Sequence, residues 1–514
     1  MGTQPCAPLA CCGAAPVLLD FPGPDFPSRA AAMSTLVVFT IAYLAVTIGI
    51  GLYAANFVSN SKDYLVAGRG LPLYMSVATV FATWFGAETV LSVSATFVKD
   101  GLGGIPADPF GASFCLVFVA LFFARAFYRM DLLTIGDFYK KRYGKGVEVL
   151  TSLAVTVSYL GWTSAQLTAL GIVFNSLSQG AISLDQGILI GAVIVLIYTT
   201  FGGMWSVALT DLFQSVVIVL GLIYVALLVS GKAGGVGTVV SHAAEAGKFQ
   251  FWPTGGSKEW WAFAGAWITM AIGSIPQQDV FQRVTSAKNE NTAVKGSLLG
   301  AAAYFTFAFV PIFLAYAALL IDPKMVEPLL KSEGREVQLI LPNLVLNHMP
   351  MFAQVMFFGA LLSAILSTAS GALLAPTALF TENVVKPLFG TMSDKRFLVM
   401  LRTVLVFFTA GVLIFALNNT STMYEMVQNA YKVTLVGAFI PLVCGIYWHR
   451  ASTQGALVSA VVGLVVWAIC EKFFADADVP PQIVGLVASA LGMIAGSLAP
   501  QLVKDARHGT HAHS

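Results

Sequence analysis

Residues Val77–Phe97 read VATVFATWFGAETVLSVSATF, an apolar run that carries Glu88 in its middle. The run is long enough to cross a bilayer, for which about 20 apolar residues suffice. A carboxylate near the centre of a membrane span costs about 2.5–3.5 kcal/mol on insertion scales and therefore marks a candidate functional site. Gly86, beside Trp84 and Phe85, is a natural place for a helix to break and to free backbone groups for ligands. The alternative is a polar cluster satisfied inside a helix bundle.

The composition assigns the whole chain to the membrane. Of its 514 residues, 57% are hydrophobic and 11% are charged, whereas soluble domains carry about 25% charged residues. Apolar runs of about 20 residues indicate helices and exclude a β-barrel. The six cysteines show no metal-ligand spacing. Because no nucleophile motif or His/Asp/Glu cluster is found and the basic residues are spread over the loops, the sequence predicts no enzyme, no organic cofactor and no nucleic-acid partner.

We predict thirteen membrane helices, at residues 34–55, 71–98, 110–130, 148–178, 184–201, 206–230, 260–282, 293–321, 352–385, 396–417, 424–448, 454–475 and 483–502. Together they form a transporter domain over residues 34–503. Residues 1–33 are rich in Pro, Ala and Cys, which predicts a poorly ordered extension, and Met33 is a candidate start of translation. Residues 504–514 are expected to be a cytoplasmic tail.

The loop charges orient these helices. One alternating set of loops carries seventeen Lys and Arg residues and the opposite set carries nine. The positive-inside rule places the first set in the cytoplasm. The N-terminus is then outside and the C-terminus inside, as an odd number of spans requires. The compact loops favour a cell inner membrane or plasma membrane.

Two of the predicted helices carry matching interruptions. The second is broken at Trp84–Gly86 and the seventh at Gly273–Pro276. If the helix at 34–55 is peripheral, residues 71–230 and 260–448 form two halves of five helices with opposite orientation, followed by two peripheral helices over 454–503. Matched Gly/Pro interruptions in two such halves point to the central site of a transporter.

The ninth helix brings hydroxyl groups to the same depth. Its sequence GALLSAILSTASGALL, residues 359–374, places Ser363 and Ser367 on one face with Thr368 adjacent. Neutral oxygens of this kind suit Na⁺ and bind it weakly enough for release. The alternative is packing of small residues, with each hydroxyl bonded back to a carbonyl of its own helix.

Four segments together carry a resemblance to a known family. They are GRGLP (68–72) with ATWFG (82–86), YTTFGGMWSVALTDLFQ (198–214), GSIPQQDVFQRV (273–284) and SAILSTASGALL (363–374). Over residues 34–500 the chain resembles the sodium/solute symporter family, nearest to its choline-transporter-like members. The resemblance implies a LeuT-like inverted-repeat fold and Na⁺-coupled uptake of a small polar organic solute by alternating access, with a monomer sufficient for transport. A channel or a membrane sensor is less favoured, because no filter-like loop or output domain is found.

The resemblance also implies site residues. The main Na⁺ site of the family falls on the backbone carbonyls of Ala82, Phe85 and Ala364 and on the side chains of Ser367 and Thr368. The family also has an aspartate at the position of Asp211, on an ion-exit route or near a second ion site. The alternative for Asp211 is a helix N-cap, since Thr-Asp before an apolar run caps well.

The candidate solute-binding residues are Trp84, Glu88, Trp162, Gln166, Gln277 and Gln278. Choline-transporter-like members have aromatic residues at the positions of Trp84, Trp162 and Gln277, which would enclose a quaternary ammonium through cation–π attraction. The glutamine at the third position argues against choline itself. Glu88 offers a charge for an amine, an acceptor for sugar hydroxyls, or a proton carrier in an alternative H⁺-coupled amine or carboxylate transporter.

Overall fold

The computed structural model describes residues 29–332, 334–390 and 392–503. The described chain is almost entirely helical, with one isolated β-bridge between Leu71 and Ala287. The first helix begins at Arg29, five residues before the predicted start of the transporter domain. The remainder of the predicted N-terminal extension and the predicted tail lie outside the described residues.

The first half of the chain contains a series of helices that ends at Lys232. They are α1 (Arg29–Ala54), α2 (Ser61–Val66), α3 (Leu73–Trp84), η3 (Glu88–Val93), α4 (Ser94–Asp100), η5 (Pro106–Gly111), α5 (Ala112–Phe118), η6 (Val119–Phe123), α6 (Ala124–Met130), α7 (Ile135–Tyr143), α8 (Lys145–Leu177) and α9 (Leu184–Lys232). Short turns of 3₁₀ helix lie at Ala55–Phe57, Ala67–Arg69 and Leu102–Gly104.

The second half continues with helices of the same kind. They are α10 (Val236–Glu245), α11 (Ser257–Ala271), α12 (Gln278–Thr285), α13 (Glu290–Ile321), α14 (Pro323–Lys331), η7 (Gly334–Leu339), α15 (Ile340–His348), α16 (Met351–Phe380), η8 (Thr381–Val385), α17 (Lys386–Phe389), α18 (Asp394–Asn418), α19 (Met423–Thr434), η9 (Leu435–Phe439), α20 (Ile440–Tyr447), α21 (Thr453–Phe473) and α22 (Pro481–Leu498).

The described residues contain nine helices long and apolar enough to cross a membrane, or ten if the bent pair of Leu73–Trp84 and Glu88–Asp100 counts as one span. The predicted number of thirteen is therefore not reached by this criterion. The three predicted spans that it leaves out are α8, which carries many Ser and Thr residues, the short first part of α9 and the interrupted pair α11 and α12. Thirteen spans stay a prediction.

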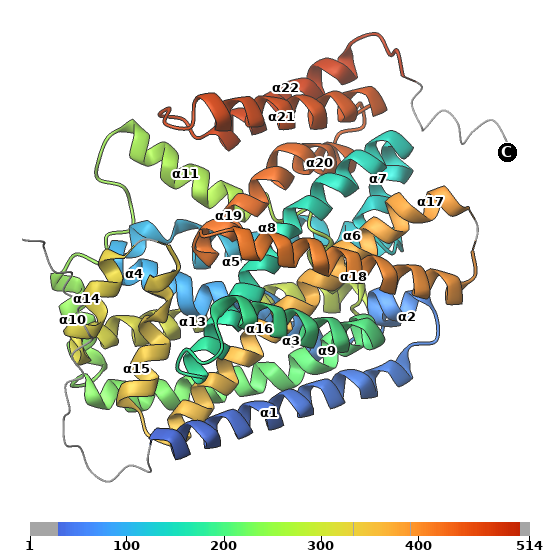
Figure 1. Cartoon of the computed structure of the whole chain (residues 1–514). Coiled ribbons are helices and arrows are strands. Elements are labelled where there is room, and N and C mark those ends of the chain that lie inside the picture. The colour runs from blue at the N-terminus through green and yellow to red at the C-terminus, as the bar shows by residue number, and fades with distance from the viewer. Residues whose placement is uncertain (1–28, 333, 391, 504–514) are drawn as a thin grey trace, which may run out of the picture.

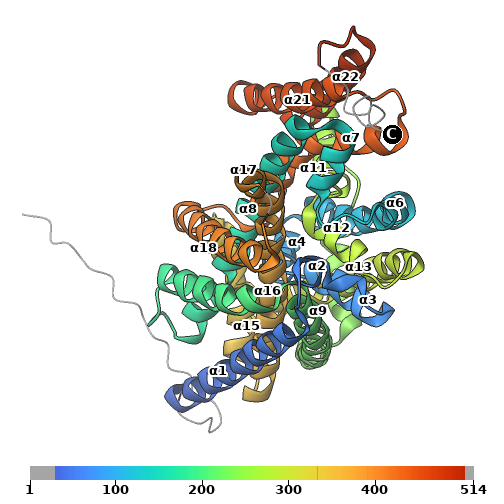
Figure 2. The ribbon, with the colours of Figure 1, turned by 90° about the vertical axis from the view of Figure 1, so that its right-hand side faces the viewer.

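The helices lie in layers around α16. In both Figure 1 and Figure 2, α1 lies on one side of the molecule and the hairpin of α21 and α22 on the other. Helix α16 packs against both α8 and α9. In an 18-residue apolar stretch of the span Met351–Phe389, 94% of the residues are buried, compared with 28% in the span Thr35–Phe57. A helix buried on all sides is a core helix. The hydroxyl groups of α16 therefore lie in the protein interior and not against lipid.

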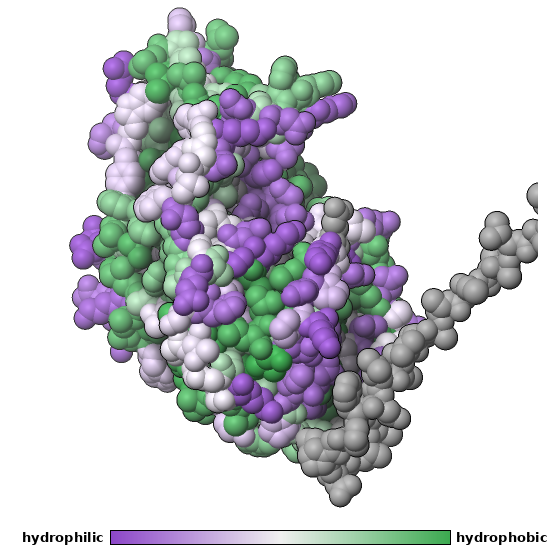
Figure 3. Space-filling model, turned by 90° about the vertical axis from the view of Figure 1, so that its left-hand side faces the viewer, coloured by the Kyte–Doolittle hydropathy of each residue, from purple (hydrophilic) through white to green (hydrophobic). Residues whose placement is uncertain are grey.

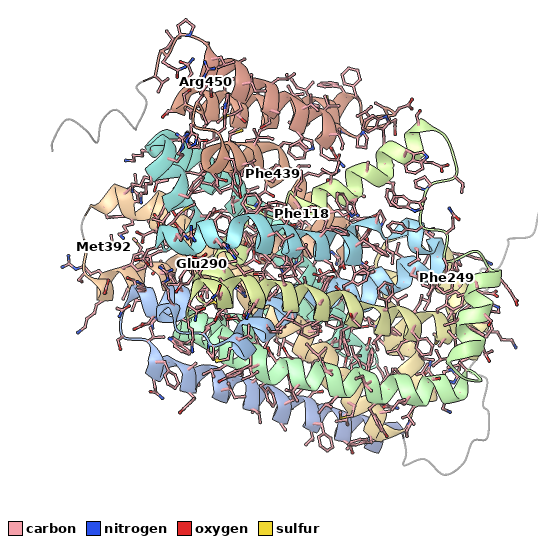
Figure 4. The ribbon with its side chains drawn as sticks, turned by 180° about the vertical axis from the view of Figure 1, so that it is seen from behind. Phe118, Phe249, Glu290, Met392, Phe439 and Arg450 are labelled. Atoms are coloured by element: carbon pink, nitrogen blue, oxygen red, sulfur yellow. The ribbon has the colours of Figure 1, made fainter. Side chains whose placement is uncertain are left out.

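The two ends of the helix bundle differ in their loops. In Figure 1, α10, α14 and α15 lie near the left-hand end, and α2, α7 and α17 near the right-hand end. Figure 3 looks at the left-hand end and shows hydrophilic residues across its middle. Figure 4 places Glu290 and Met392 at one end of the bundle and Phe249 at the other, with Phe118 between them. The two alternating sets of loops counted in the sequence therefore lie at opposite ends of the bundle.

Both predicted interruptions are confirmed. Helix α3 ends at Trp84, Phe85 has non-helical dihedral angles (φ −85°, ψ 74°), and the helix resumes with a 54° bend. In the second half, α11 ends at Ala271 and α12 begins at Gln278. Each interruption frees backbone groups in the middle of the bundle, where they need ligands or side-chain partners.

A third break lies where the sequence predicts a gap between two separate spans, at residues 202–205. Helix α9 runs through that gap and turns at Gly203, whose positive φ of 53° is unfavourable for any residue with a side chain. A Cβ atom at this position would lie 2.5 Å from the carbonyl oxygen of Tyr64. Gly203 therefore allows α2 to pack closely against α9.

Candidate functional site

The first break meets the hydroxyl groups of α16. Ser367 Oγ lies 2.9 Å from the carbonyl oxygen of Ala82 and 3.1 Å from that of Ala364. Thr368 Oγ1 lies 3.2 Å from the carbonyl oxygens of both Ala82 and Thr83. All five residues are buried. Four of the five predicted Na⁺ ligands therefore converge as a cluster of neutral oxygens, which we call the hydroxyl cluster.

The fifth predicted ligand, Phe85, lies in the break itself. Its N–H still donates to Phe81 O at 2.9 Å, as in a last helical turn, while its ψ angle turns the chain out of the helix. None of the described hydrogen bonds joins Phe85 to α16. Its carbonyl is freed from the helix, but a direct contact with the hydroxyl cluster stays a prediction.

Two neighbouring hydroxyls of α16 fit the packing alternative. Ser363 Oγ donates to Gly359 O at 2.7 Å and lies 2.5 Å from Tyr43 of α1, and Ser370 Oγ donates to Ser367 O at 2.9 Å. These two hydroxyls therefore make their hydrogen bonds within α16 or with α1. Ser367 and Thr368 differ from them because both reach the broken helix.

Glu88 is held by two of the other predicted solute residues, Trp162 and Gln166. Its Oε1 accepts a hydrogen bond from Trp162 Nε1 at 3.3 Å, and its Oε2 accepts one from Gln166 Nε2 at 2.6 Å. Gln166 Oε1 in turn accepts from the freed N–H of Ala87 at 3.2 Å. Glu88, Trp162 and Gln166 are at most 4% exposed. The break thus directs a carboxylate towards α8, where it has only neutral donors.

The sequence analysis missed a second carboxylate beside Glu88. Asp108 accepts hydrogen bonds from Tyr304 and, at 3.1 Å, from Thr89 Oγ1, while Thr89 and Tyr304 also lie 3.1 Å apart. The predicted third span begins at residue 110 and therefore places Asp108 in a loop. Helix η5 begins at Pro106, so Asp108 is inside the bundle and buried.

The remaining predicted solute residues, Trp84, Gln277 and Gln278, lie in different surroundings. Trp84 lies with its ring centroid 6.5 Å from that of Tyr304. Gln277 Nε2 donates to Ser158 Oγ at 3.0 Å and to Thr434 Oγ1 at 3.3 Å, so it joins α8 and α19 near the second break.

Gln278 has a different position. Its Oε1 accepts from the N–H of Ile135 at 2.8 Å, and its Nε2 donates to Leu133 O at 3.4 Å. In this conformation the amide of Gln278 is engaged by the backbone at the start of α7. The structure does not bring it to Glu88.

Asp211 lies inside α9 and not at a helix start, so the N-cap alternative is wrong. It is fully buried, and neither carboxylate oxygen has a hydrogen-bond partner among the described residues. Its opposite charge is Arg283 of α12, whose Nε donates to Thr83 Oγ1 at 2.9 Å. Arg283 also attracts Asp279, the second carboxylate that the sequence analysis left out of the site. The signal for Asp279 was its place directly after the second break.

Two cavities of very different size lie near this centre. Beside Trp84, a void of about 10 Å³ is bordered by Asp279 and Arg283. A much larger cavity of about 900 Å³ lies at the end of the bundle that carries Lys99 and Tyr424. Tyr424 lies beneath it, with its N–H donating to Ser92 Oγ at 3.1 Å. The centre is therefore closed, with a vestibule at one end.

The family model described as "Sodium:solute symporter family" matches residues 64–463, which include both breaks and the hydroxyl cluster. The chain belongs to the sodium:solute symporter family. It is therefore an integral membrane protein that couples the transport of a solute to Na⁺.

Characterised relatives of this symporter carry different names. The human "High affinity choline transporter 1" is 27% identical over 454 residues, covering 84% of this chain and 75% of the relative. The "Sodium/glucose cotransporter" of Vibrio parahaemolyticus is 25% identical and covers 85% of each chain. The "Sodium/pantothenate symporter" of Haemophilus influenzae is 25% identical, covering 88% of this chain and 94% of the relative.

Solved structures confirm the fold of this symporter. A Na⁺-coupled sialic acid symporter superposes with a TM-score of 0.76 at 18% identity, covering 93% of this chain and 99% of the other. The nucleobase-cation symporter Mhp1 in a closed conformation superposes with a TM-score of 0.59 at 16% identity, covering 84% and 93%. The predicted all-α fold with discontinuous helices is thereby shown.

Proposed function

We propose that this symporter moves a small polar organic solute with a positively charged group into the cell, driven by Na⁺. The observation that carries the proposal is Glu88, a buried carboxylate at the break that is held by Trp162 and Gln166. None of the ion pairs in the described part of the chain includes Glu88. A buried charge is costly unless it is paired, and a cationic solute would supply the missing partner.

The Na⁺ site proposed for this chain consists of Ala82, Phe85, Ala364, Ser367 and Thr368. The hydroxyl cluster supports it, because carbonyl and hydroxyl oxygens are hard ligands without charge. A Na⁺ ion there would connect α3 to α16. Alternating access would then move four of the predicted spans, at residues 71–98, 110–130, 260–282 and 293–321, relative to α8, α9 and α16. Na⁺ would favour the outward-open state.

The solute site proposed here consists of Trp84, Glu88, Trp162, Gln166 and Gln277. The choline transporters among the relatives suggest cation recognition, yet Gln277 replaces an aromatic residue of choline-transporter-like members and is bonded to Ser158 and Thr434. A smaller amine that donates hydrogen bonds fits this lining better than a quaternary ammonium. Gln278, the sixth predicted residue, would become available only when the start of α7 releases it.

Asp211 is proposed as part of an ion-exit route or a second ion site. Its two oxygens without hydrogen-bond partners among the described residues support this role, as does the attraction of Arg283, which donates to Thr83 beside the hydroxyl cluster. The proposal also includes a cell inner membrane or plasma membrane with the N-terminus outside and the C-terminus inside. We propose transport by a monomer, without an organic cofactor or a catalytic step.

The test is a thermal-unfolding screen of the purified protein in Na⁺ and in K⁺ against amines, quaternary ammoniums, amino acids, carboxylates and sugars. A ligand that binds only the folded state stabilises it by about 2.7 kcal/mol at a hundredfold excess over Kd. We expect stabilisation by amines that grows in Na⁺. A response to sugars or carboxylates alone would contradict the solute class, and a response to acid in place of Na⁺ would favour proton coupling through Glu88.

A further inference from the structure

Asp279 is a second carboxylate at the same aromatic group as Glu88, and like Glu88 it belongs to none of the ion pairs in the described part of the chain. It lies one residue inside α12 and is 1% exposed. Its Oδ1 accepts a hydrogen bond from the hydroxyl of Tyr159, and its own N–H donates to that hydroxyl oxygen at 2.9 Å. Its Oδ2 has no hydrogen-bond partner among the described residues. One carboxylate oxygen is thus held in place while the other is left for a ligand.

The aromatic group connects the two carboxylates. The ring of Trp162, which donates to Glu88, lies 5.8 Å from the ring of Tyr159 and 6.1 Å from the ring of Tyr431. Tyr431 is close enough to feel the charges of Asp279 and Glu88. The three rings therefore form one buried aromatic group, with Asp279 bonded to Tyr159 and Glu88 bonded to Trp162.

Helix α8 sets the separation of the carboxylates. Tyr159 holds Asp279, while Trp162 and Gln166 hold Glu88. These three residues follow one another at three and four positions along one helix, and each residue adds about 1.5 Å of rise. The partners of Glu88 thus lie about 4.5–10.5 Å farther along α8 than the partner of Asp279. This span suits a short chain between two charged groups.

The charge balance of the centre leaves room for more than one positive charge. Glu88, Asp108 and Asp279 take part in none of the ion pairs in the described part of the chain. Arg283 faces both Asp211 and Asp279 and gives its Nε–H to Thr83, so one base serves two acids. No described hydrogen bond or ion pair gives Glu88 or Asp108 a base. A Na⁺ ion at the proposed site would add one positive charge, because its ligands are neutral oxygens, and the four acids Glu88, Asp108, Asp211 and Asp279 would still outnumber Arg283 and the ion.

The void beside Trp84 gives Asp279 a second feature of a cation site. This void of about 10 Å³ is bordered by Trp84, Asp279 and Arg283, and a volume of this size holds one water molecule. An indole beside a carboxylate attracts an ammonium group through its ring face as well as through the charge. The space must widen for a solute, as the opening of a transport site requires.

We propose that the solute has two amine ends, as in a short α,ω-diamine, with one ammonium bound between Glu88 and Asp108 and the other at Asp279. The methylene chain would lie against Trp162 and Tyr431. This inference rests on the proposed function, which it extends from one positive group to two.

The experiment compares ligands that differ only in their second end. The half-saturating concentrations of 1,4-diaminobutane, 1-aminobutane and 4-aminobutanoate are measured from the thermal stability of the full-length protein in detergent, in Na⁺ and separately in K⁺. We expect the diamine to bind about tenfold more tightly than the monoamine, since a hydrogen bond to a charged group has at least that effect. The amino acid, whose second end is negative, should be the weakest.

Two variants locate the second end. Asp279→Asn should weaken diamine binding about tenfold and leave 1-aminobutane unchanged, so that the two ligands become equal. Glu88→Gln should weaken both ligands. Asp478→Asn, in the exposed turn between α21 and α22, is the matched control and should change neither. A retained thermal response to Na⁺ shows that each variant is folded.

Equal binding of the diamine and the monoamine to the unchanged protein would overturn the proposal, as would an Asp279→Asn variant that keeps the diamine preference. If Asp279→Asn does not fold, the ligand comparison on the unchanged protein and on Glu88→Gln still decides. A diamine preference together with half-saturating concentrations that are the same in K⁺ as in Na⁺ would support the two-amine solute while contradicting Na⁺ coupling. The two proposals therefore fail separately.

Discussion

The broken helix from Leu73 to Asp100 serves two polar clusters of opposite character. Towards α16, the carbonyls of Ala82 and Thr83 meet the hydroxyls of Ser367 and Thr368, and no charged side chain takes part. Towards α8, Glu88 brings a full charge to neutral donors. Neutral oxygens hold an ion loosely, whereas a buried carboxylate demands a partner. One break can thus serve an ion that must leave in every cycle and a charged solute that must be recognised.

The largest expected effect comes from removing the hydroxyl cluster. The double variant Ser367→Ala/Thr368→Ala should lose the stabilisation by Na⁺, which is about 2.7 kcal/mol at a hundredfold excess over Kd, because two of the proposed ligands are deleted. Thermal unfolding in Na⁺ and K⁺ measures it. Ser370→Ala is the control, since that hydroxyl bonds within α16. An unchanged Na⁺ response in the double variant would remove the Na⁺ site from this position.

The buried acids Glu88, Asp108 and Asp279, which we call the carboxylate cluster, can be tested through Gln166. Gln166→Leu should lower the free energy of unfolding by about 1.5–3 kcal/mol, because it takes a hydrogen bond from a buried charge and leaves the N–H of Ala87 without its partner. The cost should shrink in a Glu88→Gln background. Chemical unfolding of the four proteins of this double-mutant cycle gives the coupling. Additive effects would show that Gln166 does not support the charge.

Gln278 separates structure from recognition near the second break. Gln278→Ala should lower the free energy of unfolding by about 1–3 kcal/mol, because the buried N–H of Ile135 loses its acceptor. In the conformation described here, solute affinity should change less than it does in Gln277→Ala. Stability and ligand titrations of both variants measure this difference. A larger loss of affinity in Gln278→Ala would place Gln278 at the solute.

The smallest effect is expected where a carboxylate already has bases. Asp131, exposed after α6, is bonded to Arg69 and lies 3.3 Å from Lys62. The bond to Arg69 and the nearby charge of Lys62 hold the pKa of Asp131 below its usual value of 3.8. The pair therefore stabilises the protein at pH values above about 3.8 and loses this effect as the pH falls through the lowered pKa.

Asp131→Asn should cost about 0.2–1 kcal/mol near neutral pH and low salt. Unfolding at two pH values and two salt concentrations measures it. The difference between the variant and the unchanged protein should diminish in acid and in high salt. A difference that grows in acid would contradict the assigned pairing.

The sequence predicted the hydroxyl cluster more completely than the carboxylate cluster. Broken helices and a Ser-Thr pair are local patterns that the sequence shows directly, and the resemblance to the symporter family supplied the expectation that α3 and α16 meet there. Asp108 was missed because the third span was predicted to begin four residues too late, whereas Asp279 was missed although the predicted span 260–282 contains it, directly after the second break. Helix α8 is a predicted span that the criterion of length and hydropathy leaves out. It is buried among other helices and can therefore carry polar residues that a lipid-facing helix could not.

Gly371 of α16 shows how closely the two moving parts of such a transporter are fitted. A Cβ atom there would lie 2.4 Å from Nη2 of Arg283, which belongs to the broken helix pair of the second half. The absence of one methyl group lets Nη2 of this guanidinium approach the backbone of the central helix. Gly371→Ala would therefore act as a wedge of known size between α12 and α16, and could hold the protein away from this closed state long enough for its other conformations to be trapped and seen.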